Sequence, residues 1–136
     1  MNGTLSTNIL EDMWKKYMFI TAFSGITTAV NQPIGVVRSY PQTFRIAERI
    51  LAEMKELANA HNISLTDEQV QQAFERLRGF DHEMTSSMHQ DRRKGLPLEV
   101  EHLHGGALRL GSEVGLSMPY IETIHAMIKP YEEYQQ

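Results

Sequence analysis

The amino-acid sequence predicts an all-α fold of six to seven helices packed around one buried central helix. Two observations lead to this prediction. Apolar residues recur every three to four positions in one segment after another, and each segment begins or ends at a capping residue, a glycine or a proline. In addition, no stretch alternates apolar and polar residues for longer than about four positions, and no hairpin signal is present. The chain therefore offers helices to pack and no strands to pair.

The first helix is expected to follow a polar, glycine-containing start, residues 1–8, which is typical of a linker or a trimmed end. Thr7 or Asn8 can cap this helix, because side-chain oxygens accept hydrogen bonds from the first free N–H groups. The helix should run to about Val30. We therefore expect the folded domain to cover residues 9–136.

The second half of that helix, Tyr17–Val30, is apolar on nearly every face, so it should be the buried centre of the domain. One stripe differs. Lys16, Ile20 and Ser24 follow one another at helical spacing, with two threonines beyond them, so they share a face. A lysine at the head of an otherwise apolar helix is a candidate for chemistry, although most lysines are solvated surface groups. From the residues alone the solvated interpretation of Lys16 is favoured.

The remaining segments are bounded by proline, by capping boxes or by glycine, each of which starts or stops a helix for a known steric or hydrogen-bonding reason. Proline near the C-terminus should kink or end the last helix. The expected elements are a connector over residues 31–39 and helices over residues 41–62, 66–79, 87–95, 98–115 and 119–130.

The stretch Thr85–Gly106 carries the densest set of candidate site residues. Ser87 with Gln90 fits a capping box, and Gly95 fits a helix stop. Glu99 opens the next amphipathic helix at the edge of its apolar stripe, where a carboxylate can bind a polar ligand. The ordinary alternative is that the helix dipole favours an acidic residue at this position.

Composition narrows the class of protein. A chain of 136 residues suits one domain with a real core, and 41% apolar and 22% charged residues indicate a folded chain. The net charge of -4 weighs against nucleic acid as a partner. The absence of cysteine excludes disulfides and thiolate metal sites, and fits the cytoplasmic location that we expect. We expect no signal peptide and no membrane span, because no apolar run approaches the roughly 20 residues that a span needs.

A metal site is also disfavoured. His102 and His104 are two positions apart on a helix and point to different faces, whereas a zinc site on a helix pairs histidines four positions apart.

The order of residues in Ser86–Asp91, followed by a basic, glycine-containing turn and a helix led by Glu99 that contains Gly105, resembles the C-terminal domain of the ketopantoate reductase family. The resemblance continues upstream at Trp14–Lys16 and downstream at Gly115–Pro119, so it covers nearly the whole chain. It implies a helical domain of the 6-phosphogluconate dehydrogenase-like type. It also implies an enzyme of pantothenate biosynthesis that uses NADPH to reduce a 2-oxo acid such as 2-dehydropantoate to the 2-hydroxy acid.

The resemblance also assigns roles. Lys16, which follows Trp14 by two positions, takes the place of the catalytic lysine, a general acid that polarises the ketone oxygen and protonates it. Glu99 matches the active-site glutamate, which holds a substrate hydroxyl and helps to fix the lysine. Ser87 matches the substrate-binding hydroxyl, and Ser87 with Ser24 would orient the substrate carboxylate.

Four positions depart from the family pattern. Ile20 and Ser24 stand where asparagines often face the substrate, so both should line the pocket. Leu98 replaces the threonine before the glutamate, and His104 replaces the asparagine before the helix glycine. These changes remove polar groups from the expected pocket, which leaves a different or less polar 2-oxo acid open as the substrate.

The chain lacks the glycine-rich turn after a strand that cradles a dinucleotide phosphate. By the resemblance, NADPH would be bound mainly by an N-terminal Rossmann domain in cis, and the chain alone should be inactive. A domain cut from a longer protein is the simplest account, and a natural single-domain relative is the other. A homodimer through the stripe of Tyr17, Ile20 and Met88 is expected. A stand-alone dimerisation or small-molecule binding module without enzyme activity remains the alternative.

Overall fold

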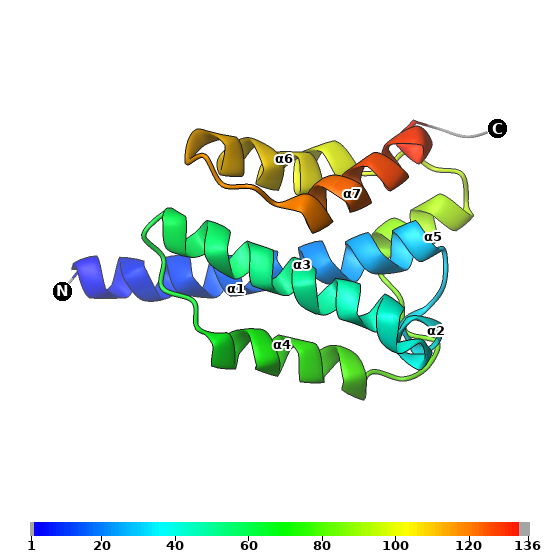
Figure 1. Ribbon diagram of the computed structural model, residues 1–136, viewed down its shortest axis with the longest axis horizontal. Helices are drawn as coiled ribbons and strands as arrows, with labels where there is room; N and C mark the ends of the chain where they lie inside the picture. The colour runs from blue at the N-terminus through cyan, green and yellow to red at the C-terminus, as the bar shows by residue number, and fades with distance from the viewer. Residues whose placement is uncertain (1, 134–136) are drawn as a thin grey trace.

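The computed structural model describes the backbone of residues 2–133 and the side chains of residues 8–133. Within these residues the protein is all-helical, which confirms the predicted fold class (Figure 1). The elements are α1 (Asn2–Val30), α2 (Ile34–Ser39), α3 (Pro41–Ala60), α4 (Asp67–Gly79), α5 (Ser87–Arg93), α6 (Val100–Glu113), α7 (Pro119–Ile128) and the short 3-10 helix η1 (Lys129–Tyr131). No helix of the described residues is long and apolar enough to cross a membrane.

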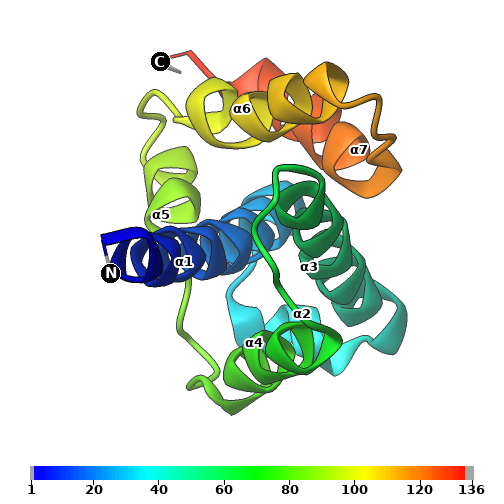
Figure 2. The ribbon, with the colours of Figure 1, turned by 90° about the vertical axis from the view of Figure 1, so that its left-hand side faces the viewer.

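Helix α1 is the centre of the domain and packs against each of the other six α-helices. Figure 2 looks along α1 and shows α3, α4, α5 and the α6–α7 pair arranged around it. Met18, Ala22 and Ile26 on this helix are no more than 1% exposed. The predicted buried central helix is therefore confirmed, and burial of such side chains is the main stabilising contribution to a fold of this size.

Helix α1 begins earlier than its capping residues predicted. It starts at Asn2, so Thr7 and Asn8 lie inside the helix and the backbone of residues 2–8 is not an irregular linker. The physical reason is that extending a formed helix costs far less than starting one, and this stretch contains no proline to block extension. The domain boundary placed after residue 8 remains a prediction.

The expected connector contains a helix of its own, α2. Its first N–H groups are satisfied from a distant loop: Ile34 N donates to Met84 O at 2.9 Å, and Gly35 N donates to His82 O at 2.8 Å. Ile34 and Val37 are fully buried. Because these partners lie far along the chain, no local sequence signal announces this helix.

Close approach of the helices around α1 depends on Gly25. A Cβ added there would lie 2.8 Å from His104 Nε2, which is closer than real Cβ contacts, and 3.0 Å from Ile124 Cγ2, which is tighter than most. Glycine at this position thus lets α6 and α7 both pack against α1. The N-terminus of α7 is held in turn by Glu53 of α3, whose buried carboxylate accepts hydrogen bonds from Tyr120 N and Ile121 N at 2.8 and 2.9 Å.

Candidate functional site

Four of the five predicted site residues line one groove between α1, α5 and α6. Ile20 and Ser24 come from α1, Ser87 opens α5, and Glu99 precedes α6. The groove has a volume of about 210 Å³. Its other lining residues are Met88, Asp91, His102 and Leu103. The tertiary structure therefore brings together residues that are far apart in the chain.

The start of α5 divides two neighbouring serines between two roles. Ser86 is buried and caps the helix, because its Oγ accepts from His89 N at 3.2 Å and lies 2.7 Å from Thr27 Oγ1. Ser87 is the first helical residue and is exposed. The prediction that Ser87 forms the cap was thus wrong by one position. The correction leaves the Ser87 hydroxyl without a structural role in the described chain, so it is available to a ligand.

His89 ties α5 to the end of α1. Its Nε2 donates to Asn31 Oδ1 at 3.0 Å, and its Nδ1 accepts from the Thr85 hydroxyl at 2.7 Å. Burial, helped by Arg93 and Arg92, lowers the pKa of His89 to about 4. The ring is therefore neutral near pH 7, and both of its nitrogens are satisfied. No local signal in the sequence indicates this contact, which joins the end of α1 to α5.

Glu99 sits at the N-cap position of α6 but makes no capping hydrogen bond, and its side chain is exposed. Asp91 lines the same groove from α5. Neither carboxylate has an ion pair within the part of the chain that the structure describes. The groove therefore presents two unpaired carboxylates, two serine hydroxyls and an apolar wall.

Lys16, the fifth predicted residue, lies in an adjoining groove between α1 and α4. That groove has a volume of about 440 Å³. Ile20 lines both grooves, so they meet at this side chain. Lys16 is exposed and has no ion pair among the described residues. A direct approach of Lys16 to Glu99 remains a prediction.

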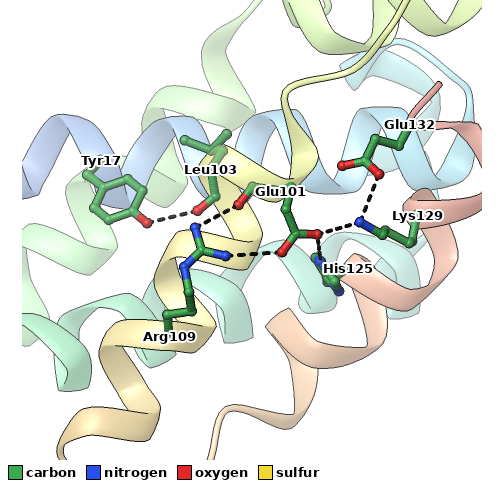
Figure 3. A network of polar contacts seen from close by, with 7 residues as sticks. All are labelled: Tyr17, Glu101, Leu103, Arg109, His125, Lys129 and Glu132. Atoms are coloured by element: carbon green, nitrogen blue, oxygen red, sulfur yellow. Dashed lines mark hydrogen bonds and ion pairs between the residues drawn. The ribbon is translucent and has the colours of Figure 1, made fainter. Parts of the chain in front are cut away.

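A different carboxylate on α6 is fully engaged (Figure 3). Glu101 binds Arg109 at 3.1 Å, His125 at 3.0 Å and Lys129 at 2.7 Å, and Lys129 also binds Glu132 at 2.8 Å. The hydrogen bonds from Lys129 and His125 lower the pKa of Glu101 to about 2. This network joins α6 to α7 and η1, so Glu101 has a structural role.

The expected exposed stripe of Tyr17, Ile20 and Met88 is not present. Met88 is only 5% exposed. Tyr17 is half-buried, and its hydroxyl donates to Leu103 O at 2.8 Å (Figure 3). Packing within the domain covers both side chains. They therefore help to hold α1 against α5 and α6. This correction removes the predicted surface for self-association.

The next two observations concern the buried His104 and the residues that could bind a metal ion. His104 is fully buried, and its Nε2 donates to Thr21 O at 2.9 Å. Burial lowers the pKa of His104 to about 4. Among the described residues no three His, Cys, Asp or Glu side chains are grouped so as to hold a metal ion.

Known proteins are similar to this chain over almost its whole length. The family model described as the ketopantoate reductase PanE/ApbA C terminal matches residues 8–132. The uncharacterized oxidoreductase YkpB of Bacillus subtilis is 29% identical over 128 residues, which cover 94% of this chain and 42% of that protein. A 2-dehydropantoate 2-reductase of Halobacterium salinarum is 24% identical over 129 residues, covering 95% of this chain and 42% of that protein.

A solved structure extends the comparison to three dimensions. The dimeric ketopantoate reductase from Staphylococcus aureus superposes with a TM-score of 0.86 at 25% identity, over 91% of this chain and 43% of that one. The chain thus spans about two fifths of the length of the relatives it matches.

Proposed function

Because the chain belongs to the family of ketopantoate reductase C-terminal domains, we propose that it is the substrate-binding and catalytic half of a 2-oxo acid reductase. The observation that carries this proposal is the groove formed by Ile20, Ser24, Ser87 and Glu99, with Lys16 in the groove beside it. Residues with no structural partner that meet around one side chain, Ile20, are better explained by a ligand than by folding. The reaction would turn a 2-oxo acid, such as 2-dehydropantoate, into the 2-hydroxy acid.

In this reaction Lys16 is the general acid. Its ammonium group polarises the ketone oxygen and donates a proton to that oxygen as the ketone carbon accepts a hydride. The C–H and O–H bonds form together with loss of the C=O double bond, and the lysine is left neutral. Glu99 accepts a hydrogen bond from the substrate's hydroxyl, while Ser87 and Ser24 add polar contacts and Ile20 lines the wall.

The hydride would come from NADPH. The described residues contain no strand followed by a glycine-rich turn, so this domain does not fit the cofactor phosphates by itself. We propose that an N-terminal Rossmann domain in cis holds the cofactor, and that the chain alone is inactive. A cytoplasmic location and a role in pantothenate synthesis belong to the same proposal.

Self-association is a separate part of the proposal. A relative of known structure is dimeric. Since Tyr17 and Met88 are used internally, a homodimer of this chain would need another surface. Tyr120 and Met127 on α7, which are 38% and 52% exposed beside a groove that also includes Ile46, are the best candidates. Sedimentation equilibrium of the wild type and of Met127→Glu measures the dimer affinity. The same affinity in both proteins would exclude the α7 surface as the dimer interface.

The test of the catalytic proposal is reduction by a two-domain protein that carries this chain behind a Rossmann domain. We expect oxidation of NADPH that depends on an added 2-oxo acid, followed at the absorbance of the reduced nicotinamide. The matched control is the same protein with Glu101→Gln, which changes the structural network and leaves the groove intact. No turnover with any 2-oxo acid by a folded protein that binds NADPH would refute the proposal.

A further inference from the structure

The turn between α5 and α6, residues 94–99, carries Glu99 at its end. Its first half is held by the helix before it, because the N–H groups of Gly95 and Leu96 donate to carbonyl groups of α5 at 3.1 and 2.9 Å. Gly95 closes this half with a φ of 71°, a left-handed conformation that glycine adopts without strain. The start of the turn therefore follows from local contacts with α5.

The second half of the turn is held by a distant part of the chain. Pro97 has no N–H group to donate. The next residue, Leu98, donates its N–H to Glu132 O at 2.8 Å, and its side chain is buried in the core. The peptide group beside Glu99 is thus fixed by a residue that lies far away in the sequence.

Residues 129–132, which we call the C-terminal strap, also contact the end of α5. The Arg92 guanidinium carbon lies 3.8 Å from the centre of the Tyr131 ring, and Arg92 donates a hydrogen bond to Thr28 O on α1. A cation is attracted to the face of an aromatic ring, and more strongly where water is partly excluded, as at the half-buried Arg92. The strap is therefore joined to α5 and α1, the helices that form the other walls of the groove.

The ion pairs of the C-terminal strap contribute less to this attachment. Lys129 binds Glu101 at 2.7 Å and Glu132 at 2.8 Å (Figure 3). The Lys129 side chain is 46% exposed, and pairs this exposed stabilise a fold only weakly. The Tyr131 ring and the Glu132 carbonyl are therefore the contacts that hold the strap against the turn.

Glu99 has no contact of its own that would fix its position. Its side chain is exposed and makes no capping hydrogen bond with α6. Its place at the groove is consequently set by the backbone on either side, which is α6 after it and the peptide group of Leu98 before it.

We propose that the C-terminal strap sets the position of Glu99 at the groove. Tyr131 acts through Arg92 as a positioning residue. The Glu132 carbonyl acts through the N–H of Leu98. That Glu99 holds a substrate hydroxyl rests on the proposed function, whereas the ordering of the turn does not. Without the strap the turn adopts further conformations, and the affinity for a ligand that needs Glu99 falls with the fraction of molecules in the right one.

The ordering of the turn is tested on the chain itself, without a ligand. Deletion of residues 131–136 removes the ring and the carbonyl. NMR relaxation of the backbone amides should then give order parameters for Leu98 and Glu99 that fall from about 0.85, typical of rigid backbone, to below about 0.6. Amides in the core of α1 should keep their order parameters, which shows that the domain is still folded.

The matched control for the deletion is Lys129→Ala. This variant removes both ion pairs of the C-terminal strap and keeps the Tyr131 ring and the Glu132 carbonyl. We therefore expect Leu98 and Glu99 to stay rigid in it.

The effect on ligand binding is measured in the two-domain protein with two acids. They are 2-dehydropantoate and 3,3-dimethyl-2-oxobutanoate, which lacks only the hydroxyl group. The deletion should raise KM for 2-dehydropantoate about tenfold, the scale of one lost hydrogen bond. It should leave kcat and the KM for the other acid unchanged. A loss of stability alone would not separate the two acids.

Tyr131→Leu tests the same contact without shortening the chain, and so covers the case in which the deletion prevents folding. It removes the ring from Arg92 and keeps the Glu132 carbonyl. We expect KM for 2-dehydropantoate to rise about threefold, the scale of one exposed cation–π contact. Tyr131→Phe keeps the ring and should restore the wild-type KM.

The outcomes separate this inference from the catalytic proposal. Rigid amides at Leu98 and Glu99 after the deletion would overturn the inference, whatever the enzyme does. An equal rise of KM for both acids would overturn it as well, because it would show general damage to the groove. If the turn loses its order but the intact two-domain protein reduces neither acid, the catalytic proposal fails and the ordering of the turn by the C-terminal strap stands.

Discussion

Glu99 and Glu101 lie two positions apart at the start of α6 and differ in their side-chain contacts. Glu101 is bound by Arg109, His125 and Lys129, and joins α6 to α7. Glu99 faces a groove and has no ion pair in the described chain. Because residues two apart on a helix point to different faces, one face carries the structural contacts and the other borders the groove.

The same division recurs at the start of α5, where Ser86 caps the helix from a buried position and Ser87 lies exposed at the groove. In both places a residue type alone says little about its role. Its partners decide: a polar group whose bonds are all made within the protein holds the fold, and one left unpaired at a groove can bind something else. Substitutions on the structural side should change stability, and substitutions on the groove side should change ligand behaviour.

The largest expected effect is a loss of folding stability at acidic pH, which tests the residues with structural contacts. The folded pKa values of His89 and His104 are about 4, against an ordinary value of 6.5. Between these values the unfolded chain binds protons that the folded chain does not, so stability is fully present above pH 6.5 and falls as the pH drops toward 4. Each unit of difference is about 1.4 kcal/mol per group, so urea unfolding should show a loss of several kcal/mol. His89→Gln should flatten this slope, whereas the exposed groove residue His102→Gln should not.

On the groove side, the largest effect is expected from Lys16. Lys16→Ala in the two-domain protein should lower kcat by about 100-fold, the usual scale for losing a general acid. The melting temperature should stay the same, because the side chain is exposed and unpaired among the described residues. Lys129→Ala is the matched control, with kcat preserved. An unchanged kcat for Lys16→Ala would show that Lys16 is not the general acid.

Glu53 gives the next effect, again on the structural side. Glu53→Gln leaves one of the two α7 N–H groups without its acceptor, and such a loss costs about 1–3 kcal/mol. Burial raises the pKa of Glu53 despite these two hydrogen bonds. Its contribution to stability therefore falls as the pH rises through the ordinary value of 4.5, opposite in sign to that of the histidines. Urea unfolding measures the stability of Glu53→Gln, and Glu56→Gln, at an exposed position, is the control. Equal stabilities of the two variants would contradict a structural role for the Glu53 carboxylate.

The smallest effect compares the two α6 carboxylates directly. Glu101→Gln should cost up to about 1 kcal/mol at low salt, because pairs this exposed are strongly screened. The pKa of Glu101 is lowered to about 2 from 4.5, so its stabilisation is present above pH 4.5 and lost as the pH falls toward 2. High salt should shrink the difference. Glu99→Gln should leave the melting temperature unchanged, and a loss equal to that of Glu101→Gln would show that both carboxylates are structural.

Sequence patterns predicted the helices best where the signal was local. The capping box of Thr66 and Gln69 is present, and Gly95 and Gly115 adopt the positive φ values of 71° and 68° that end a helix. Four site residues expected to meet do line one groove. The resemblance supplied that set, since the spacing of serine, lysine and glutamate residues does not by itself bring them together.

The misses have a common physical cause. Helix α2 depends on carbonyl groups of His82 and Met84, and the cap of α7 comes from Glu53 on another helix. Likewise, Met88 was expected in an exposed stripe with Tyr17 and Ile20, but it belongs to the buried core. Each of these contacts joins residues far apart in the chain, and periodicity or capping patterns cannot detect them.

Local chemistry in the chain was enough to specify an all-helical domain with α1 at its centre, because helix periodicity and caps act within a few residues. Which polar groups hold the fold and which remain for a ligand depended on how the helices pack. That packing engaged the side chains of Glu101, Ser86 and His104, and left those of Glu99, Ser87 and Arg76 without ion-pair or hydrogen-bond partners among the described residues. It also placed opposite charges in two grooves that meet at Ile20. Such an arrangement exists only in three dimensions, because its members come from four different helices and the turn before α6.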